Sequence, residues 1–330
     1  MDKNDFESIR EYNEIYKKGR QISKASSCMI CGKICSSFCN SHTLPQMVLK
    51  NILNDGKLNT AFWLLGDKNN PDVLKQNKGL NNAGVFHLIC NDCDSKIFNE
   101  YEQEDIFKKP FTDEILNLIT LKSSLYMYYK YQIQRYADSI LCKDIENNEI
   151  LDNNNERYAN EFKEDIEECK KILNNKEDKS QHYKILFWRK LNYKVPLATQ
   201  TCYGLRYNFE GKIVSGEPMV YVLICPFEEY STICLYSKND ESVINKLAFP
   251  QNASLQKKLS LINNLIIVNT EDYYVSKELE KRLDEKKKQE LRSMSYSLEY
   301  ANPFSMSKQA SYMKDSFNYI NLLLEKYKES

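Results

Sequence analysis

Two Cys-x-x-Cys pairs constrain this chain more than any other feature of its sequence. The first pair is Cys28 and Cys31, and the second is Cys90 and Cys93. Two thiolates at this spacing can bind one metal ion, and two such pairs complete a tetrahedral Zn²⁺ site with S–Zn distances of about 2.3 Å. Gly32 follows the first pair, where a residue without a Cβ atom lets the backbone turn tightly around the sulfur atoms. We therefore expect one structural zinc site held by these four cysteines.

The sequence around the second pair predicts how this site is built. An apolar run at 85–89 precedes Cys90, and a helix-like stretch begins at Asp94. A knuckle, followed by a strand and then by a helix that carries the last ligands, is the order of a treble-clef zinc finger. The 58 residues between the two pairs exceed the usual spacing of about 15–20. We therefore expect an irregular insertion over residues 57–84, interrupted by the apolar segment 61–65.

A second assembly of the zinc site also agrees with the sequence. Cys39 and His42 form a Cys-x-x-His pair that could join the first Cys-x-x-Cys pair. That arrangement would leave the second Cys-x-x-Cys pair without a role or give it a second metal ion. The four-cysteine arrangement uses both pairs and does not require His42. We favour it and keep the other open.

Composition and hydropathy predict a globular protein without a membrane partner. Hydrophobic residues make up 42% and charged residues 28% of the chain, and no apolar run approaches the roughly 20 residues that a membrane helix needs. The polar start of the sequence is unlike a signal peptide, so we expect a cytoplasmic protein. Thiols stay reduced there, which favours metal binding over disulfides. We expect the scattered cysteines to be small buried hydrophobic side chains; they are Cys142, Cys169, Cys202, Cys225 and Cys234.

Charge is unevenly distributed along the chain although its formal net charge is zero. Residues 17–57 hold seven basic side chains and one acidic, a net charge of +6, whereas residues 90–114 hold eight acidic and three basic, a net charge of −5. The basic segment could contact the phosphates of a nucleic acid, or it could be a solvated basic face. The candidate phosphate contacts are Lys17, Lys18, Arg20 and Lys24.

Hydrophobic periodicity predicts an α+β chain in three regions. These are a zinc module at 1–110, a helical connector at 111–180 and an α+β domain with antiparallel hairpins at 181–330. The connector should contain a long helix from 111 to about 145, whose tyrosines pack between helices, and a second helix near 156–174. In the last region β-type runs at 219–224 and 232–236 predict a hairpin. Further elements are expected there as helices at 241–263, 276–293 and 306–328 and a strand at 265–268.

Three segments of the zinc module together resemble the zinc-stabilised branch of the HNH endonucleases, which have a ββα-metal fold. The segments are Cys28-x-x-Cys31, Ser41-His42-Thr43-Leu44-Pro45 and Leu88-Ile89-Cys90-x-x-Cys93-Asp94-x-Lys96, and the likeness covers about residues 25–105. The resemblance implies a structural zinc on the two Cys-x-x-Cys pairs. It also implies that His42 is a general base that activates water against a phosphodiester, and that Asp94 helps to bind a catalytic Mg²⁺ or Mn²⁺.

The sequence departs from the HNH pattern at two positions. Ser41 stands where the family has an Asp or His that ligates the catalytic metal, and Val85 stands where an Asn is expected before the second cysteine pair. These departures concern the catalytic residues and leave the zinc ligands intact.

Two function hypotheses follow. The first is an HNH-like zinc protein that binds nucleic acid, DNA rather than RNA, and cuts it as a metal-dependent endonuclease; a likeness to bacterial HNH-like proteins suggests a role in antiphage defence. The second is a noncatalytic zinc module that binds nucleic acid or a protein partner or trigger. In the second, His42 would hydrogen-bond a zinc-bound sulfur or cap the following helix. The C-terminal domain would supply recognition or regulation, because its sequence contains no evident catalytic constellation.

Overall fold

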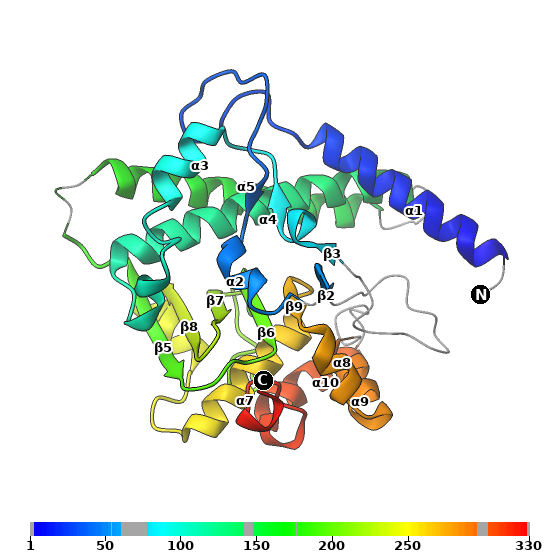
Figure 1. Cartoon of the computed structure of the whole chain (residues 1–330), viewed down its shortest axis with the longest axis vertical. Helices are drawn as coiled ribbons and strands as arrows, with labels where there is room; N and C mark the ends of the chain where they lie inside the picture. The colour runs from blue at the N-terminus through cyan, green and yellow to red at the C-terminus, as the bar shows by residue number, and fades with distance from the viewer. Residues whose placement is uncertain are drawn as a thin grey trace. The chain divides into compact units, whose positions relative to one another are not determined.

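The computed structural model describes residues 3–53, 55–60, 78–141, 148–175, 177, 179–295 and 303–328. Within them it combines helices with antiparallel strands, which confirms the predicted α+β class (Figure 1). The chain forms two compact units. Unit 1 comprises residues 1–43, 84–103 and 114–180, and unit 2 comprises residues 44–83, 104–113 and 181–330. The domain boundaries predicted at 110 and 180 stay a prediction, and the apolar segment 61–65 and Cys142 lie outside the described residues.

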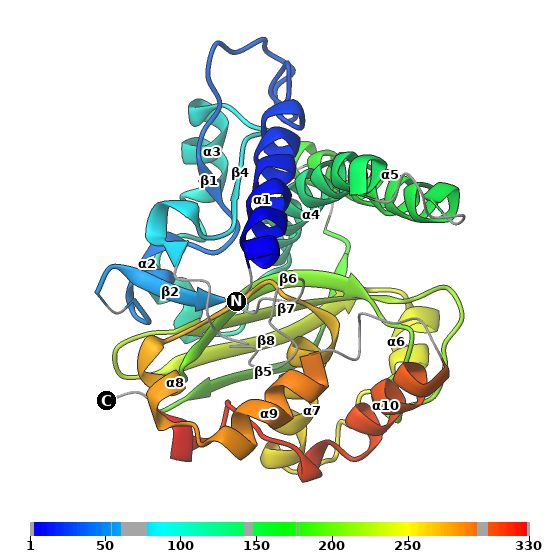
Figure 2. The same cartoon turned by 90° about the vertical axis from the view of Figure 1, so that its right-hand side faces the viewer.

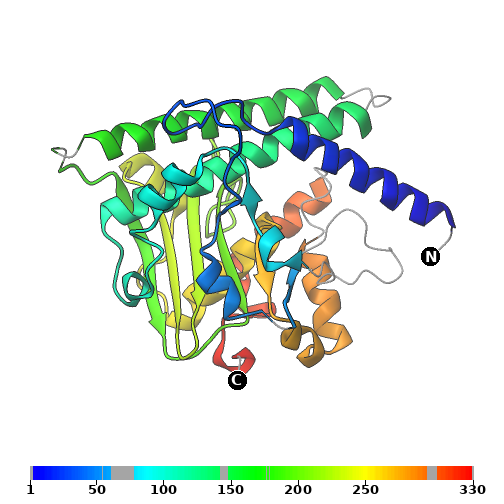
Figure 3. The ribbon, with the colours of Figure 1, turned by 45° about the horizontal axis from the view of Figure 1, so that its top comes forward.

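Three long helices form the frame of unit 1: α1 (Lys3–Ile22), α4 (Asp113–Leu141) and α5 (Asn148–Asn174). Helices α4 and α5 lie side by side (Figure 3), and Tyr131 of α4 stacks on Tyr158 of α5 with ring centroids 5.2 Å apart. The Asn117 side chain of α4 also donates a hydrogen bond to the Cys169 carbonyl of α5 at 3.1 Å. Both helices of the predicted connector are therefore present.

Tyrosine side chains also join α1 to α4. The Tyr129 hydroxyl donates to the carbonyl of Arg20 at 3.0 Å, and the Tyr16 hydroxyl donates to Oε1 of Gln134 at 2.8 Å. Tyr129 further packs against the edge of the His87 ring. The tyrosines of α4 thus pack between elements of unit 1, as predicted.

The rest of unit 1 is built around two short strands. β1 (Ser41–His42) and β4 (Val85–Phe86) pair in antiparallel register. Before them, a bridge between Ser27 and Ile34 closes a hairpin. After them, α3 (Asn91–Phe98) begins with Cys90 at its N-cap position. A hairpin, a short strand and a helix therefore follow one another, and the helix begins at Asn91, three residues before the expected start at Asp94.

A seven-stranded sheet forms the centre of unit 2 (Figure 2). Its strands lie in the order β3-β2-β9-β6-β7-β8-β5, and each neighbouring pair is antiparallel. Their bounds are β2 (Lys57–Thr60), β3 (Lys78–Gly79), β5 (Tyr183–Leu191), β6 (Leu197–Gly204), β7 (Met219–Pro226), β8 (Ser231–Lys238) and β9 (Tyr273–Val275). Strands β7 and β8 confirm the predicted hairpin.

The prediction of an irregular insertion over residues 57–84 is wrong at β2 and β3. Residues 57 and 58 pair with β3, and residues 59 and 60 pair with β9, a strand more than 200 positions later in the chain. A polar segment can form a strand when a distant strand supplies partners for its backbone groups, because every buried N–H and C=O group needs one. Local sequence does not reveal such a partner.

Helix α7 (Leu255–Asn269) belongs to the hydrophobic core of the sheet in unit 2, and its residues 259–268 are all buried. The run 265–268, predicted as a strand, is instead the end of this helix, because a short apolar run has the same pattern in a buried helix as in a strand. The helix predicted over 241–263 is divided into α6 (Glu241–Leu247) and α7 by a turn in which Ala248 has a φ of +52°.

The other helices of unit 2 are shorter than predicted. The charged regions 276–293 and 306–328 contain α8 (Lys277–Arg282), α9 (Glu285–Ser295) and α10 (Pro303–Lys314). The remaining helix is α2 (Gln46–Lys50), and 3₁₀ turns lie at Leu80–Asn82, Glu104–Lys108, Ser316–Asn318 and Glu325–Tyr327. Across the described residues of both units, no helix has the length and apolar character needed to cross a membrane.

The scattered cysteines are confirmed as buried side chains where the structure describes them. Cys169, Cys202, Cys225 and Cys234 are all buried. Burial raises the pKa of Cys225 and of Cys234. These thiols therefore stay neutral and fill space in the interior.

Buried amides on α7 hold the C-terminal segment of the chain. The Asn263 side chain donates to the carbonyl of Ile320 at 2.8 Å and accepts from the backbone N–H of Leu322 at 2.8 Å. The neighbouring Asn264 donates to the carbonyl of Tyr312 at 2.8 Å. These amides satisfy backbone groups of a segment that would otherwise be buried without partners.

We expect Asn263→Ala to lower the free energy of unfolding by about 2–4 kcal/mol, because it leaves a buried carbonyl and a buried N–H group without partners. Urea denaturation would measure the change. Asn269→Ala is the matched control on the same helix, since its amide bonds only to the Leu265 carbonyl one turn earlier, and it should cost less than about 1 kcal/mol. Equal stability of the two variants would contradict the role assigned to Asn263.

Candidate metal centre

Cys28, Cys31, Cys90 and Cys93 come together in unit 1. Their four sulfur atoms all lie within 4.8 Å of one another, and Sγ of Cys31 is 3.9 Å from Sγ of Cys90. Thiolates placed 2.3 Å from one zinc ion form a tetrahedron with edges of about 3.8 Å. The sulfur separations therefore fit a metal ion such as zinc, and the predicted four-cysteine set is the one that the structure assembles.

Backbone hydrogen bonds place the four thiols. Gly32 has a φ of +72°, and its N–H donates to the Cys28 carbonyl at 2.8 Å, which closes the tight turn after the first pair. The N–H of Met29 donates to the Leu88 carbonyl at 3.0 Å, which ties the hairpin to the segment leading into Cys90. The N–H of Cys90 in turn donates to Sγ of Cys28 at 3.4 Å. The turn at Gly32 and the hydrogen bonds between the hairpin and the segment before α3 thus bring the two cysteine pairs together.

The electrostatics of the cluster favour a bound cation. Burial alone would raise the pKa of Cys28, but hydrogen bonds from backbone groups of Cys31, Cys90 and Ile30 lower it to about 7. The pKa of Cys93 is raised by burial and by its hydrogen bonds with the other three cysteines. One thiolate is therefore favoured at neutral pH while a neighbouring thiol resists ionisation. A divalent cation supplies the charge that lets all four thiolates coexist, and zinc bound there would cross-link the hairpin to α3.

Cys39 lies outside this cluster. Its thiol donates a hydrogen bond to Oδ2 of Asp94 at 3.3 Å. Burial and the negative charge of Asp94 raise the pKa of Cys39 to about 12, so the group stays a neutral thiol at physiological pH. The assembly in which Cys39 and His42 complete the zinc site is therefore not the one formed.

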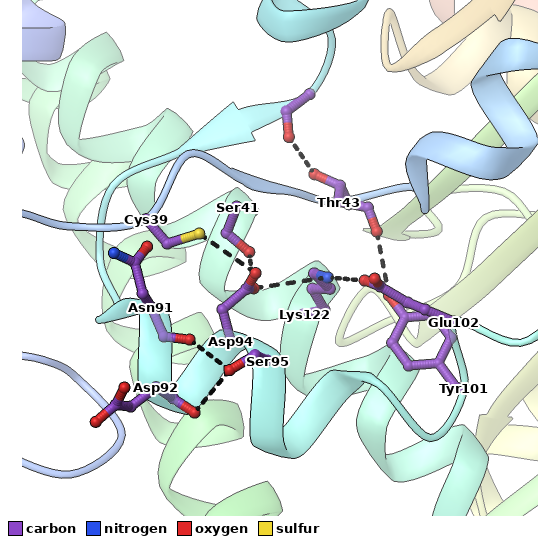
Figure 4. A network of polar contacts seen from close by, with 11 residues as sticks. Cys39, Ser41, Thr43, Asn91, Asp92, Asp94, Ser95, Tyr101, Glu102 and Lys122 are labelled. Carbon is purple, nitrogen blue, oxygen red and sulfur yellow. Dashed lines mark hydrogen bonds and ion pairs between the residues drawn. The ribbon is translucent and has the colours of Figure 1, made fainter.

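Asp94 is held by three side chains (Figure 4). It lies in the first turn of α3, directly after Cys93. Its Oδ1 accepts a hydrogen bond from the Ser41 hydroxyl at 2.5 Å and lies 3.8 Å from Nζ of Lys122, and its Oδ2 accepts from Cys39. Ser41 reaches Asp94 from β1, and Lys122 reaches it from α4. The carboxylate proposed as a ligand for a catalytic metal ion therefore already has a set of donors.

Lys122 is the one buried cation of this network in the described structure. Its side chain is 1% exposed, and it forms an ion pair with Glu102 as well as with Asp94 (Figure 4). Its ammonium nitrogen lies 4.5 Å from the ring centroid of Phe98 and 5.5 Å from that of Tyr101, distances at which a cation is attracted to an aromatic face. Lys122 was not among the predicted site residues. The available signal was that the residues three positions away on either side, Ile119 and Leu125, are apolar, which places the lysine on an apolar stripe of the helix.

His42 lies in β1 beside Ser41, and only 8% of it is exposed. Successive side chains of a strand point to opposite faces, and Ser41 is the one that contacts Asp94. The next residue, Thr43, is fixed through its hydroxyl, which donates to the Gly84 carbonyl at 2.9 Å, and through its carbonyl, which accepts from the Tyr101 hydroxyl at 3.4 Å. The catalytic roles of His42 and Asp94 stay a prediction.

We expect Cys90→Ser to remove zinc from the protein and to lower its melting temperature, because three thiolates bind the ion more weakly than four and the link from hairpin to helix is lost. Zinc content per chain, measured by elemental analysis after gel filtration, would check this. Cys39→Ser is the matched control, and it should retain one zinc ion per chain. Loss of zinc from Cys39→Ser with retention in Cys90→Ser would reverse the assignment of ligands.

Comparisons with known proteins did not identify a related protein. No protein-family model matches the chain, and no curated protein or solved structure is significantly similar to it. The likeness to HNH endonucleases therefore rests on the motifs at 28–31, 41–45 and 88–96, and the function has to be argued from the site itself.

Proposed function

We propose that this chain is an HNH-like zinc protein whose N-terminal treble-clef module binds nucleic acid. The order of hairpin, short strands and α3 supports the treble-clef assignment, since Cys28 and Cys31 lie on the hairpin and Cys90 and Cys93 at the start of the helix. The cytoplasmic location and the role in antiphage defence belong to the same proposal and are supported by the sequence alone. Unit 2 would supply recognition or regulation.

The observation that carries this proposal is an exposed basic segment joined to the metal site. Residues 17–33 contain five basic side chains and no acidic one, and all five are exposed: Lys17, Lys18, Arg20, Lys24 and Lys33. Two apolar side chains beside them are also exposed, Ile22 at 58% and Ile34 at 90%. Exposed cations with adjacent apolar groups suit a nucleic acid, which offers phosphates together with sugars and bases.

Salt dependence tests the proposal. If three to five of these cations neutralise phosphates of duplex DNA, raising salt from about 50 to about 200 mM should weaken binding by about 40- to 500-fold. We expect a triple replacement of Lys17, Lys18 and Arg20 by Gln to lower the slope of log K against log salt by about 2.7. Fluorescence anisotropy with duplex DNA and with RNA of the same sequence would measure both, and we expect DNA to bind more tightly.

The control for this experiment is a second triple variant, with Lys286, Lys287 and Lys288 of α9 in unit 2 replaced by Gln. It removes the same charge and should leave the slope unchanged. An affinity that does not respond to salt, or an equal effect of the two triples, would contradict phosphate binding by the basic segment. Absence of binding to either nucleic acid would favour a protein partner instead.

A second candidate function is metal-dependent cleavage. The observation behind it is that β1, which carries His42, is joined to the first turn of α3 by the hydrogen bond from Ser41 to Asp94, with the His42 side chain on the opposite face of the strand from Ser41. In this candidate His42 takes a proton from the attacking water, and Asp94 helps to hold Mg²⁺ or Mn²⁺, which would stabilise the leaving oxygen. Ser41 would orient the carboxylate through its hydroxyl.

The cleavage candidate predicts that zinc-loaded protein nicks plasmid DNA with Mg²⁺ or Mn²⁺, and that His42→Ala slows this by about 100-fold or more while keeping its zinc. His42→Asn is a second variant, because the histidine is buried and alanine would leave a cavity. His87→Ala is the matched control. Full cleavage by a folded His42→Ala protein would exclude His42 as the base, and no cleavage by the wild type with either metal leaves binding alone.

A further inference from the structure

We infer that Lys122 is the built-in cation of the Asp94–Glu102 carboxylate pair, so that this site is complete without a divalent metal ion. The inference is independent of nucleic-acid binding, because it concerns only the three side chains and what they exclude. It bears on the cleavage candidate, which needs Asp94 to accept Mg²⁺ or Mn²⁺.

Lys122 and the two carboxylates differ in their exposure to solvent. The Lys122 side chain is 1% exposed, whereas Asp94 is 23% and Glu102 35% exposed. The ammonium therefore reaches the carboxylates from the interior of unit 1, and the carboxylates keep their contact with water. A buried ammonium is costly unless it is paired, and here two carboxylates of α3 and the segment after it provide that pairing.

Two aromatic rings lie beside the ammonium group of Lys122. The rings of Phe98 and Tyr101 both lie within cation–π distance of Nζ. Phe98 and Tyr101 are themselves fully buried. An ammonium carried on a long apolar stem suits such rings, whereas Mg²⁺ or Mn²⁺ prefers oxygen ligands and bound water. The aromatic wall therefore favours the lysine over a metal ion.

Both carboxylate oxygens of Asp94 already have neighbouring donors. Oδ1 of Asp94 already receives the Ser41 hydroxyl and lies beside Nζ of Lys122, and Oδ2 receives the Cys39 thiol. A divalent ion on Oδ1 would stand next to an ammonium of the same sign whose side chain is only 1% exposed, so water screens the repulsion between the two charges less than it does between fully exposed charges. Lys122 thus takes the place that a divalent ion would need.

Mn²⁺ binding to the zinc-loaded protein tests the inference. We expect electron paramagnetic resonance titration to detect no stoichiometric Mn²⁺ site in the wild type. We expect one site in Lys122→Met, with an affinity about tenfold or more above any residual Mn²⁺ binding by the wild type, because the variant leaves two carboxylates without their cation. The double variant with Asp94→Asn should lose that site. Lys130→Met, two turns further along α4, is the matched control and should bind Mn²⁺ no better than the wild type.

Two results would overturn the inference. The first is a Mn²⁺ site in the wild type that Asp94→Asn removes, which needs no change at Lys122. The second is a folded, zinc-containing Lys122→Met protein without a Mn²⁺ site, which would show that the lysine charge is not what excludes the ion. Lys122→Gln repeats the test with a polar side chain if methionine prevents folding. The salt dependence of DNA binding is measured separately, so its failure would leave this inference standing.

Discussion

The contact on which unit 1 depends is the meeting of four thiols from two distant parts of the sequence. Cys31 and Cys90 lie 59 positions apart, yet their sulfur atoms are 3.9 Å from each other. The strands beside them, β1 and β4, contain only two residues each, and a ladder this short has little stability of its own. A metal ion on the four thiolates would supply the missing free energy, as it does in small zinc modules. Such an ion would hold the first turn of α3 beside β1, where Asp94 accepts the hydrogen bond from Ser41.

In unit 1 basic side chains lie both at the surface and in the interior. The basic side chains of residues 17–33 are exposed, whereas the buried cation, Lys122, offsets one of the two negative charges of Asp94 and Glu102 close to the four-cysteine cluster. An unpaired Asp94–Glu102 pair would repel the phosphates of an approaching nucleic acid. An internal lysine reduces that repulsion at any concentration of divalent ions. If the module binds nucleic acid as proposed, this arrangement suits holding a polyanion better than recruiting Mg²⁺ to cut it.

Local signals in the sequence identified the four-cysteine cluster, whereas the features that the sequence did not reveal depend on long-range contacts. Cys-x-x-Cys spacing and Gly32 are features of a few adjacent residues, and the structure places them as expected. The partners of Asp94 are 55, 53 and 28 positions away, at Cys39, Ser41 and Lys122, and no periodicity relates them. The same limit explains β2, whose partner β9 is distant, and the run 265–268, which is apolar enough for a strand but lies inside a buried helix.

Three buried polar side chains of unit 2 form hydrogen bonds to the backbone. Asn263 and Asn264 bond to main-chain groups of the C-terminal segment, and the Thr199 hydroxyl donates to the Asp272 carbonyl at 2.6 Å. A side chain committed to a buried backbone group cannot exchange that bond for a substrate without leaving the backbone group unsatisfied, which costs about 1–3 kcal/mol. These side chains therefore fix the positions of the chain around α7 and β6.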